Sequence, residues 1–283
     1  MKASRENRLD QGSRDARGLV RTQDRDRYFA TLFAPEPARA ALFVLYAFNV
    51  EIARIREVVS DPLPGEVRQQ WWRDVLNGAT TELSHPLARA LMPMIEQYRL
   101  PRKALLDLIE ARSFDLYDDP MPSWNDLTGY CGETSSALFR LASLILADGS
   151  EPGSAEACGH AGVAYALTGL LRALPWHSRR GQVYIPEEVL RPFNLGRPDL
   201  TQGRDSPELR SALALVRARA RQHLEKAKAL IPSVSRAAES AFRPLALIEP
   251  YLKQMERAGY RPFETIVDLA DWKRIAFLWR WRL

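Results

Sequence analysis

Two pairs of acidic residues, Glu57 with Asp61 and Asp115 with Asp119, have the spacing that places carboxylates together on one face of a helix. Carboxylate oxygens are the ligands that Mg²⁺ prefers, so such pairs are candidates for metal-assisted chemistry. The second acid of each pair, however, directly precedes a proline, which marks a helix end. We therefore expect these four acids to be solvated residues at helix ends rather than metal ligands.

Other catalytic motifs are missing from the sequence. It contains no glycine-rich phosphate-binding loop, no nucleophile-elbow serine and no His-Glu-x-x-His segment. Its two cysteines, Cys131 and Cys158, have neither zinc-ligand spacing nor the number that a secreted disulfide framework needs. The histidines are scattered along the chain, at His85, His160, His177 and His223. These residues predict neither a metal site built on imidazoles nor a cofactor.

The segments that must position these residues are predicted to be helical throughout. Apolar residues recur at helical spacing almost everywhere, and no stretch alternates as a strand would. The first strong segment covers 37–60, where Pro37 suits a first helical turn and the segment stops before Pro62. Segment 154–174 is unusually small and apolar, as expected of a helix that is buried on most sides. The predicted fold class is all-α.

Capping residues mark two later helix starts. Ser123 or Asn125 can cap one helix, and Asp205 or Ser206 can begin a long basic one. Between them, a loop rich in Arg, Gly and Pro is expected over 175–203.

Length and composition predict one domain preceded by a short tail. The 283 residues are 46% hydrophobic and 27% charged, enough to bury a sizeable core. Residues 1–27 mix acidic residues with arginine and have no apolar stretch, which predicts a flexible tail rather than a signal peptide. Residues 28–283 form the predicted domain, and no uncharged stretch in its middle is long enough to span a bilayer.

Four segments in the right order resemble the squalene/phytoene synthase family. The two signature regions are Leu45-Tyr46-Ala47-Phe48 and the stretch from Leu170-Leu171-Arg172 to Arg179-Arg180-Gly181-Gln182-Val183-Tyr184-Ile185-Pro186. Between them lie an acidic stretch and a Tyr-Cys segment that are similar to the family's own: Glu110 with Asp115-Leu116, and Tyr130-Cys131. The resemblance implies an isoprenoid-synthase-like helical bundle around a central apolar cavity.

Members of this family join two prenyl diphosphates, and Mg²⁺ neutralises the diphosphate that leaves. The resemblance implies that two pairs of aspartates on facing helices hold this metal. The present sequence departs from that pattern, because Ala53 and Glu57 occupy the positions of the first pair, and Ala173 and His177 those of the second. Three of the four carboxylates are absent, so we expect the magnesium sites to have been lost.

As a set, the departures resemble one branch of the family, which includes a mitochondrial assembly factor for respiratory complex I. This resemblance is carried by Asn49-Val50-Glu51, Gln70-Trp71-Trp72 and Trp176-His177-Ser178-Arg179-Arg180. It implies a non-catalytic assembly factor whose partner is a respiratory-complex subunit or an assembly intermediate. The alternative is an active prenyltransferase that condenses two farnesyl or geranylgeranyl diphosphates, with Mg²⁺ bound by the acids at 57, 61, 115 and 119.

Three arginines, Arg172, Arg179 and Arg180, match the family's diphosphate-facing positions and have two interpretations. They could bind phosphate oxygens directly. They could instead pair with acids such as Glu57 or Asp115, where lost aspartates would leave buried positive charge uncompensated. A prenyl diphosphate or lipid ligand is also expected, with contacts from Tyr46, Phe48, Glu51, Tyr130, Tyr165, Arg172, Arg179, Arg180 and Tyr184.

Two surface stretches bear on partners and location. Segment 205–231 carries six Lys and Arg residues, a pattern typical of a solvated helix side. The stretch 277–283 interleaves aromatic residues with arginine, which suits a membrane interface, a partner groove, or core packing of Trp279 or Trp281. No nucleic-acid-binding module accompanies the net charge of +5, so nucleic acid is not an expected partner. The expected location is the bacterial cytoplasm with peripheral membrane contact, or the matrix side in a mitochondrion.

Overall fold

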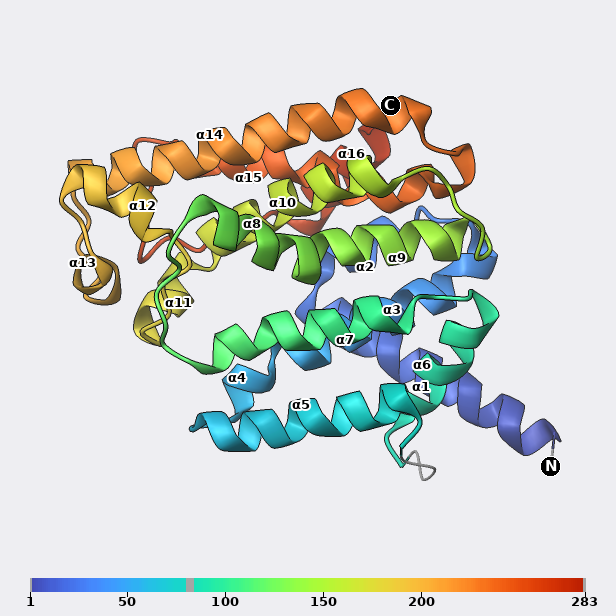
Figure 1. The fold of residues 1–283 in the computed structure, drawn as a ribbon. Helices are drawn as coiled ribbons and strands as arrows, with labels where there is room; N and C mark the ends of the chain where they lie inside the picture. The colour runs from blue at the N-terminus through green and yellow to red at the C-terminus, as the bar shows by residue number, and fades with distance from the viewer. Residues whose placement is uncertain (1, 80–83, 282–283) are drawn as a thin grey trace.

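The computed structural model describes residues 2–79 and 84–281 of the chain. Every secondary-structure element within these residues is a helix, which confirms the predicted all-α class (Figure 1). Among the described helices, none is both long enough and apolar enough to cross a membrane.

The helices follow one another with short connections. The N-terminal half comprises α1 (Lys2–Gln23), α2 (Arg25–Thr31), α3 (Glu36–Ala53), α4 (Ile55–Val58), α5 (Pro62–Asn77), α6 (Pro86–Gln97), α7 (Arg102–Ala111), η1 (Arg112–Leu116), α8 (Trp124–Cys131), η2 (Gly132–Ser136) and α9 (Ala137–Leu146). The C-terminal half comprises α10 (Ala155–Arg172), α11 (Leu174–Arg179), α12 (Glu187–Leu190), η3 (Arg191–Phe193), α13 (Arg197–Thr201), α14 (Pro207–Leu230), η4 (Ile231–Ser233), η5 (Arg236–Leu247), α15 (Ile248–Gln254) and α16 (Asp271–Arg280).

The helix α10 lies at the centre of the C-terminal half. It runs along α14 and also packs against α9, η2, η5 and α15, while α3 contacts α1, α6 and α9 (Figure 1). Small side chains allow these close approaches, since Ala157, Ala161 and Ala164 of α10 are almost completely buried. Gly162 is required outright, because a Cβ there would lie 2.2 Å from the backbone of Ser136 in η2. The predicted buried helix at 154–174 is therefore confirmed.

Helix starts follow the predicted caps. The Ser123 hydroxyl accepts a hydrogen bond from the Asp126 N–H at 3.3 Å, and the Ser206 hydroxyl accepts one from the Leu209 N–H at 3.2 Å. The expected loop over 175–203 is not a plain loop, because it contains most of α11 together with α12, η3 and α13. Prolines near the starts of these short helices are compatible with a first turn, where no backbone donor is required.

The structure corrects the flexible tail expected over 1–27, of which Met1 lies outside the described residues. The chain forms α1 and the first turn of α2 there, and α1 packs against α3 and α6. Ala16 and Val20 are spaced by four residues and are buried at 3% and 0% exposure. A narrow apolar stripe therefore suffices to dock a helix whose other side chains are mostly polar.

Candidate functional site

A small cavity lies among residues of α2, α3, η1, α8, η2, α10 and α11, with a volume of about 220 Å³. Apolar groups such as Leu170 and Ala173 form part of its wall. Its polar lining side chains are Arg27, Asn49, Arg112, Tyr130, Thr134, Ser135, Tyr165 and His177. The site is therefore a small, open cavity with charged groups at its wall, and the central apolar cavity stays a prediction.

Asp115 is the acceptor at the centre of a buried hydrogen-bond network beside this cavity. Its Oδ1 accepts hydrogen bonds from the hydroxyls of Tyr130 at 2.8 Å and Tyr184 at 2.7 Å. Its Oδ2 accepts one from Arg112 at 3.0 Å, and its backbone carbonyl accepts another from Gln182 at 2.9 Å. Because both carboxylate oxygens are occupied, Asp115 functions in this structure as an anchor for the surrounding side chains.

The two tyrosines stay protonated in this network. Burial raises the pKa of the Tyr130 hydroxyl well above its ordinary value, and the nearby Asp115 carboxylate raises it further. The pKa of Tyr184 is raised by the same two causes. Both hydroxyls therefore remain hydrogen-bond donors at neutral pH rather than bases.

Arg27 supplies a second charged group to the cavity wall. The side chain pairs with Asp24 at 2.8 Å, and its guanidinium lies 4.6 Å from the Tyr165 ring centroid and 5.4 Å from that of Tyr46. Burial alone would lower the pKa of Arg27, but Asp24 outweighs it and the pKa is raised. The arginine is therefore a permanent cation placed between two aromatic faces.

Several buried polar atoms near the cavity make no hydrogen bond within the described part of the chain. They include Asn49 Oδ1, Ser135 Oγ and Arg112 Nε, and the first two residues are 6% and 5% exposed. Buried polar groups are usually paired, so unpaired ones beside a cavity indicate a place for a polar group. With Arg27 and Arg112 close by, the arrangement suits a small polar or anionic group.

The residues predicted to contact a ligand separate into two sets. Tyr130 and Tyr165 line the cavity, while Tyr46 and Tyr184 are buried beside groups of its wall. Phe48 instead packs in the core against Trp72, with ring centroids 5.3 Å apart. Glu51 also lies away from the cavity, because it lines a separate groove between α3, α4, α5 and α6.

Arg172 does not line the cavity, which corrects the expected grouping with Arg179 and Arg180. Its guanidinium bonds to Asp26 at 2.8 Å and to the Val267 carbonyl at 3.1 Å. Burial alone would raise the pKa of Asp26. The charges of Arg172 and of Arg274 in α16 instead hold this pKa below its usual value. Arg172 therefore holds the C-terminal segment against α2.

Arg180 pairs with Glu57 at 3.2 Å, which favours internal pairing over direct phosphate binding for this residue. Arg54 also contacts the Glu57 carboxylate, at 3.3 Å. Arg179 is exposed to solvent. Ligand binding by these arginines therefore stays a prediction.

The residues at the four expected metal positions do not fit a Mg²⁺ cluster. Ala53 and Ala173 have no oxygen ligand, and Glu57 is engaged by two guanidiniums. Burial lowers the pKa of His177 to about 4, and its neutral ring packs 4.6 Å from that of Tyr184. The described residues contain no group of three or more His, Cys, Asp or Glu side chains that could hold a metal ion.

The other candidate acids do not supply the missing ligands. Asp61 and Asp119 are exposed, and Asp61 is the residue immediately before α5. This agrees with the expectation that these two acids are solvated. The same expectation is wrong for Asp115, because its side chain is buried among hydrogen-bond donors.

Sequence reasoning missed four of the residues at the cavity: Arg27, Asn49, Arg112 and Ser135. One signal was available, because Arg112 precedes Asp115 by three residues and an ion pair at that spacing is common in helices. The other three have no local signal, since they come together only when α2, α3 and η2 pack around α10.

The arrangement of helices is the fold of the isoprenoid synthases. A dehydrosqualene synthase structure superposes with a TM-score of 0.83 at 14% identity, covering 97% of this chain and 96% of that one. Squalene synthase HpnC from Alicyclobacillus acidocaldarius gives a TM-score of 0.75 at 24% identity, covering 90% and 97%. The chain belongs to the squalene/phytoene synthase family, whose model matches residues 20–276.

Relatives in this family carry two kinds of name. Complex I assembly factor 6 from Rattus norvegicus is 28% identical over 247 residues, which are 87% of this chain and 74% of that protein. The human assembly factor is 26% identical, and the match again covers 87% of this chain and 74% of that protein. A 15-cis-phytoene synthase from Synechococcus elongatus is 23% identical, covering 95% of this chain and 92% of that enzyme.

Proposed function

We propose that this chain is a non-catalytic factor in the assembly of respiratory complex I. Relatives named complex I assembly factor 6 in mammals support this role, and they match across most of this chain. The proposed partner is a subunit or an assembly intermediate of that complex. Prenyl transfer by an active enzyme is the alternative, since phytoene synthases are also relatives.

The observation that carries the proposal is the chemistry at the four metal positions. A departing diphosphate needs its charge neutralised, and Mg²⁺ does so only when oxygen ligands hold it. Here two positions are alanines, one is a neutral histidine, and the remaining Glu57 is paired with Arg54 and Arg180. The loss of three of the four carboxylates, with the fourth paired to arginines, favours an assembly role over turnover.

The test combines a gene deletion with an enzyme assay. Deletion should lower the amount of assembled complex I on native gels and its NADH:quinone reductase activity, and the wild-type gene should restore both. A Glu57→Gln variant should restore them equally, because the carboxylate has no catalytic role. The purified protein should leave farnesyl and geranylgeranyl diphosphate unchanged in the presence of Mg²⁺.

Two results would contradict the assembly role. One is a deletion strain with normal complex I. The other is product formation that disappears in Glu57→Gln but survives in Glu187→Gln, whose exposed side chain lies outside the candidate metal positions and makes it the control.

The proposal includes a bound prenyl or lipid compound with a polar end. Arg27 and Arg112, with the unpaired Oδ1 of Asn49, favour an anionic or polar group at the cavity. At about 220 Å³ the cavity is smaller than the roughly 300–1,000 Å³ of typical ligand pockets, so a long chain would require movement of the surrounding helices. Mass spectrometry of organic extracts checks this, because recovery of no such compound from the purified protein contradicts it.

A further inference from the structure

The C-terminal helix α16 presents an apolar stripe to solvent. Trp272 and Trp279 are each 68% exposed, and Ile275 between them is 40% exposed. Their spacing of three and four residues places them with Ala276 on one side of the helix. This is the pattern of a buried helix face, yet here the face has no partner within the described part of the chain.

The opposite side of α16 is firmly attached to the bundle. Arg274 is 1% exposed and donates hydrogen bonds to Asp26 at 2.6 Å, Asp268 at 2.6 Å and Asp271 at 2.8 Å. Leu278, one turn further on, is completely buried. The contacts of Arg274 and Leu278 therefore fix the orientation of α16, so that the apolar stripe faces solvent.

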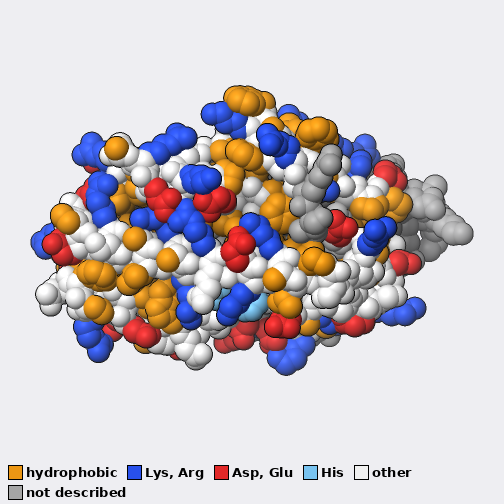
Figure 2. Space-filling model, turned by 90° about the horizontal axis from the view of Figure 1, so that it is seen from above, with side chains coloured by type: hydrophobic (Ala, Val, Ile, Leu, Met, Phe, Trp, Pro, Cys, Tyr) orange, Lys and Arg blue, Asp and Glu red, His pale blue; other side chains and the backbone are white. Residues whose placement is uncertain are grey.

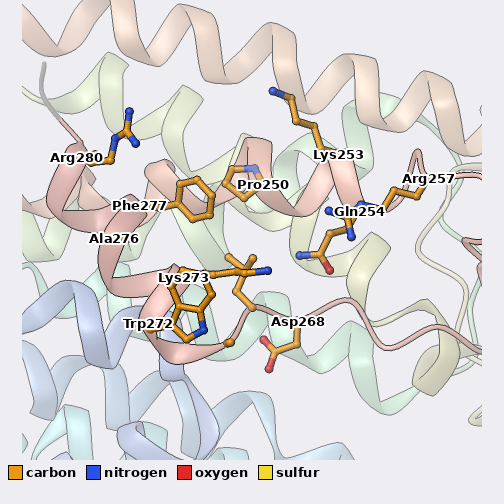
Figure 3. Close-up of a pocket in the computed structure, with 12 residues that line it drawn as sticks. Pro250, Lys253, Gln254, Arg257, Asp268, Trp272, Lys273, Ala276, Phe277 and Arg280 are labelled. Carbon is orange, nitrogen blue, oxygen red and sulfur yellow. The ribbon is translucent and has the colours of Figure 1, made fainter.

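Basic side chains surround a groove beside this stripe. The groove between α15 and α16 has a volume of about 610 Å³, and Figure 3 shows Lys253, Arg257, Lys273 and Arg280 around it. The acid in its lining, Asp268, already accepts a hydrogen bond from Arg274. The groove consequently carries an excess of positive charge and suits an anionic partner.

The stripe and the groove share one helix. Trp272 and Ala276 belong to both, and Phe277, 39% exposed, extends the apolar surface into the groove. The Lys273 ammonium lies 5.3 Å from the Trp272 ring centroid, so cation and aromatic ring are adjacent. In the view from above, hydrophobic side chains lie among Lys and Arg side chains on the visible face (Figure 2).

We propose that α16 and the adjoining groove form a membrane-binding surface for anionic phospholipids. Tryptophan has an apolar ring with one polar N–H and favours the interface between lipid and water. Lys and Arg flanking such rings attract lipid phosphates. The two tryptophans protrude, which suits a surface that side chains can penetrate. Ile275 and Trp279 lie outside the lining of the groove, so an acidic partner helix seated in the groove would leave them exposed, whereas a lipid surface covers stripe and groove together.

This surface is separate from the cavity around Asp115, and the proposal stands independently of the assembly role. A chain that fails to support complex I assembly can still bind vesicles, and a chain that supports assembly can fail to bind them. The two experiments therefore test the two proposals separately.

Sedimentation of the full chain with vesicles tests the proposal. We expect binding to phosphatidylcholine mixed with phosphatidylglycerol, little binding to phosphatidylcholine alone, and weaker binding as salt rises. Lys273→Gln and Arg280→Gln should each weaken binding about fivefold, the effect of removing one interfacial charge. The Trp272→Ala/Trp279→Ala variant should weaken it by about tenfold or more, because apolar area no longer enters the interface.

Matched controls lie on other helices. Leu63 and Val67 of α5 are 68% and 64% exposed, so Leu63→Ala/Val67→Ala removes comparable exposed apolar groups. Lys103→Gln on α7 removes a basic side chain that is 84% exposed. Both controls should leave binding unchanged, and circular dichroism should show all variants folded.

Three outcomes would overturn the membrane surface. They are equal binding to neutral and anionic vesicles, full binding by the double tryptophan variant, and equal losses in the α5 control. Absence of vesicle binding together with a defined complex between α16 and an acidic protein would assign the surface to that protein instead.

Discussion

At the scale of single residues, the acids of this chain serve structure. Asp115 resembles part of the family's acidic stretch, yet its oxygens accept hydrogen bonds from Arg112, Tyr130 and Tyr184. A carboxylate that accepts hydrogen bonds from three surrounding donors has used most of its roughly four acceptor positions, which disfavours metal binding in this arrangement. The same residue type can therefore retain its position while its chemical role changes.

Replacing Asp115 by Asn should destabilise the fold by about 3 kcal/mol. The amide leaves the Arg112 guanidinium without its counter-charge in a buried site, and breaking one side of such a pair is costly. Urea denaturation followed by circular dichroism measures the change in unfolding free energy.

Asp119→Asn provides the control, since this exposed acid lies four residues further on and should change stability by no more than about 0.5 kcal/mol. Equal effects of the two substitutions would show that the network around Asp115 contributes no special stability.

At the scale of elements, close helix packing places the cavity. The residues of η2 face α10 because Gly162 lets the two backbones approach, and η2 carries Ser135 into the cavity wall. The turn of η2 is wider than an α-helical turn, a feature that is frequent at functional sites. A packing contact between two helices thus decides which polar groups reach the cavity.

Gly162→Ala should lower thermal stability strongly, with a loss of about 2–3 kcal/mol or more, because the new methyl group meets the Ser136 backbone. Gly159→Ala in the same helix is the matched control. A Cβ at residue 159 meets nothing within 4 Å, so alanine there should stabilise the helix by up to about 1 kcal/mol.

Thermal denaturation of both variants checks this pair of expectations. A destabilisation that is the same at both glycines would point to backbone flexibility instead of contact with η2.

At the scale of the whole molecule, two distant parts of the chain meet where the family would hold its metal. Glu57 lies in α4 and Arg180 directly follows α11. The ion pair between these two side chains joins the two regions. The scaffold of the family is therefore retained, while the charge pattern between its halves is different.

Millimolar Mg²⁺ should leave the thermal midpoint unchanged when it is added with diphosphate, compared with diphosphate alone. A ligand raises the midpoint only if it binds the folded state, and the facing positions offer no set of carboxylates. Differential scanning fluorimetry gives the midpoints. A Mg²⁺-dependent rise that is absent from Glu57→Gln would reverse the conclusion that the metal site has been lost.

Diphosphate alone separates anion binding from metal binding. A rise in the midpoint without Mg²⁺ would report on cations such as Arg27 and Arg112.

The sequence by itself determined the helical class and the family, and it predicts the loss of the metal ligands. Apolar spacing, serine caps such as Ser206 and prolines act over a few residues, so the capped helix starts could be predicted closely. The predicted segment 37–60 is instead divided into α3 and α4, a break that no local signal marked. The substitutions at Ala53 and Ala173 were equally visible, because an absent oxygen does not depend on folding.

Only the tertiary structure decided which charges meet. Arg172 pairs with Asp26, which is 146 residues away, and a narrow stripe that includes Ala16 and Val20 docks α1, although composition had assigned this segment to a flexible tail. The exposure of Trp279, which the pattern of its neighbours left open, was also decided by packing. A side chain's partner depends on how distant helices are oriented, and that orientation follows from the packing of the whole core.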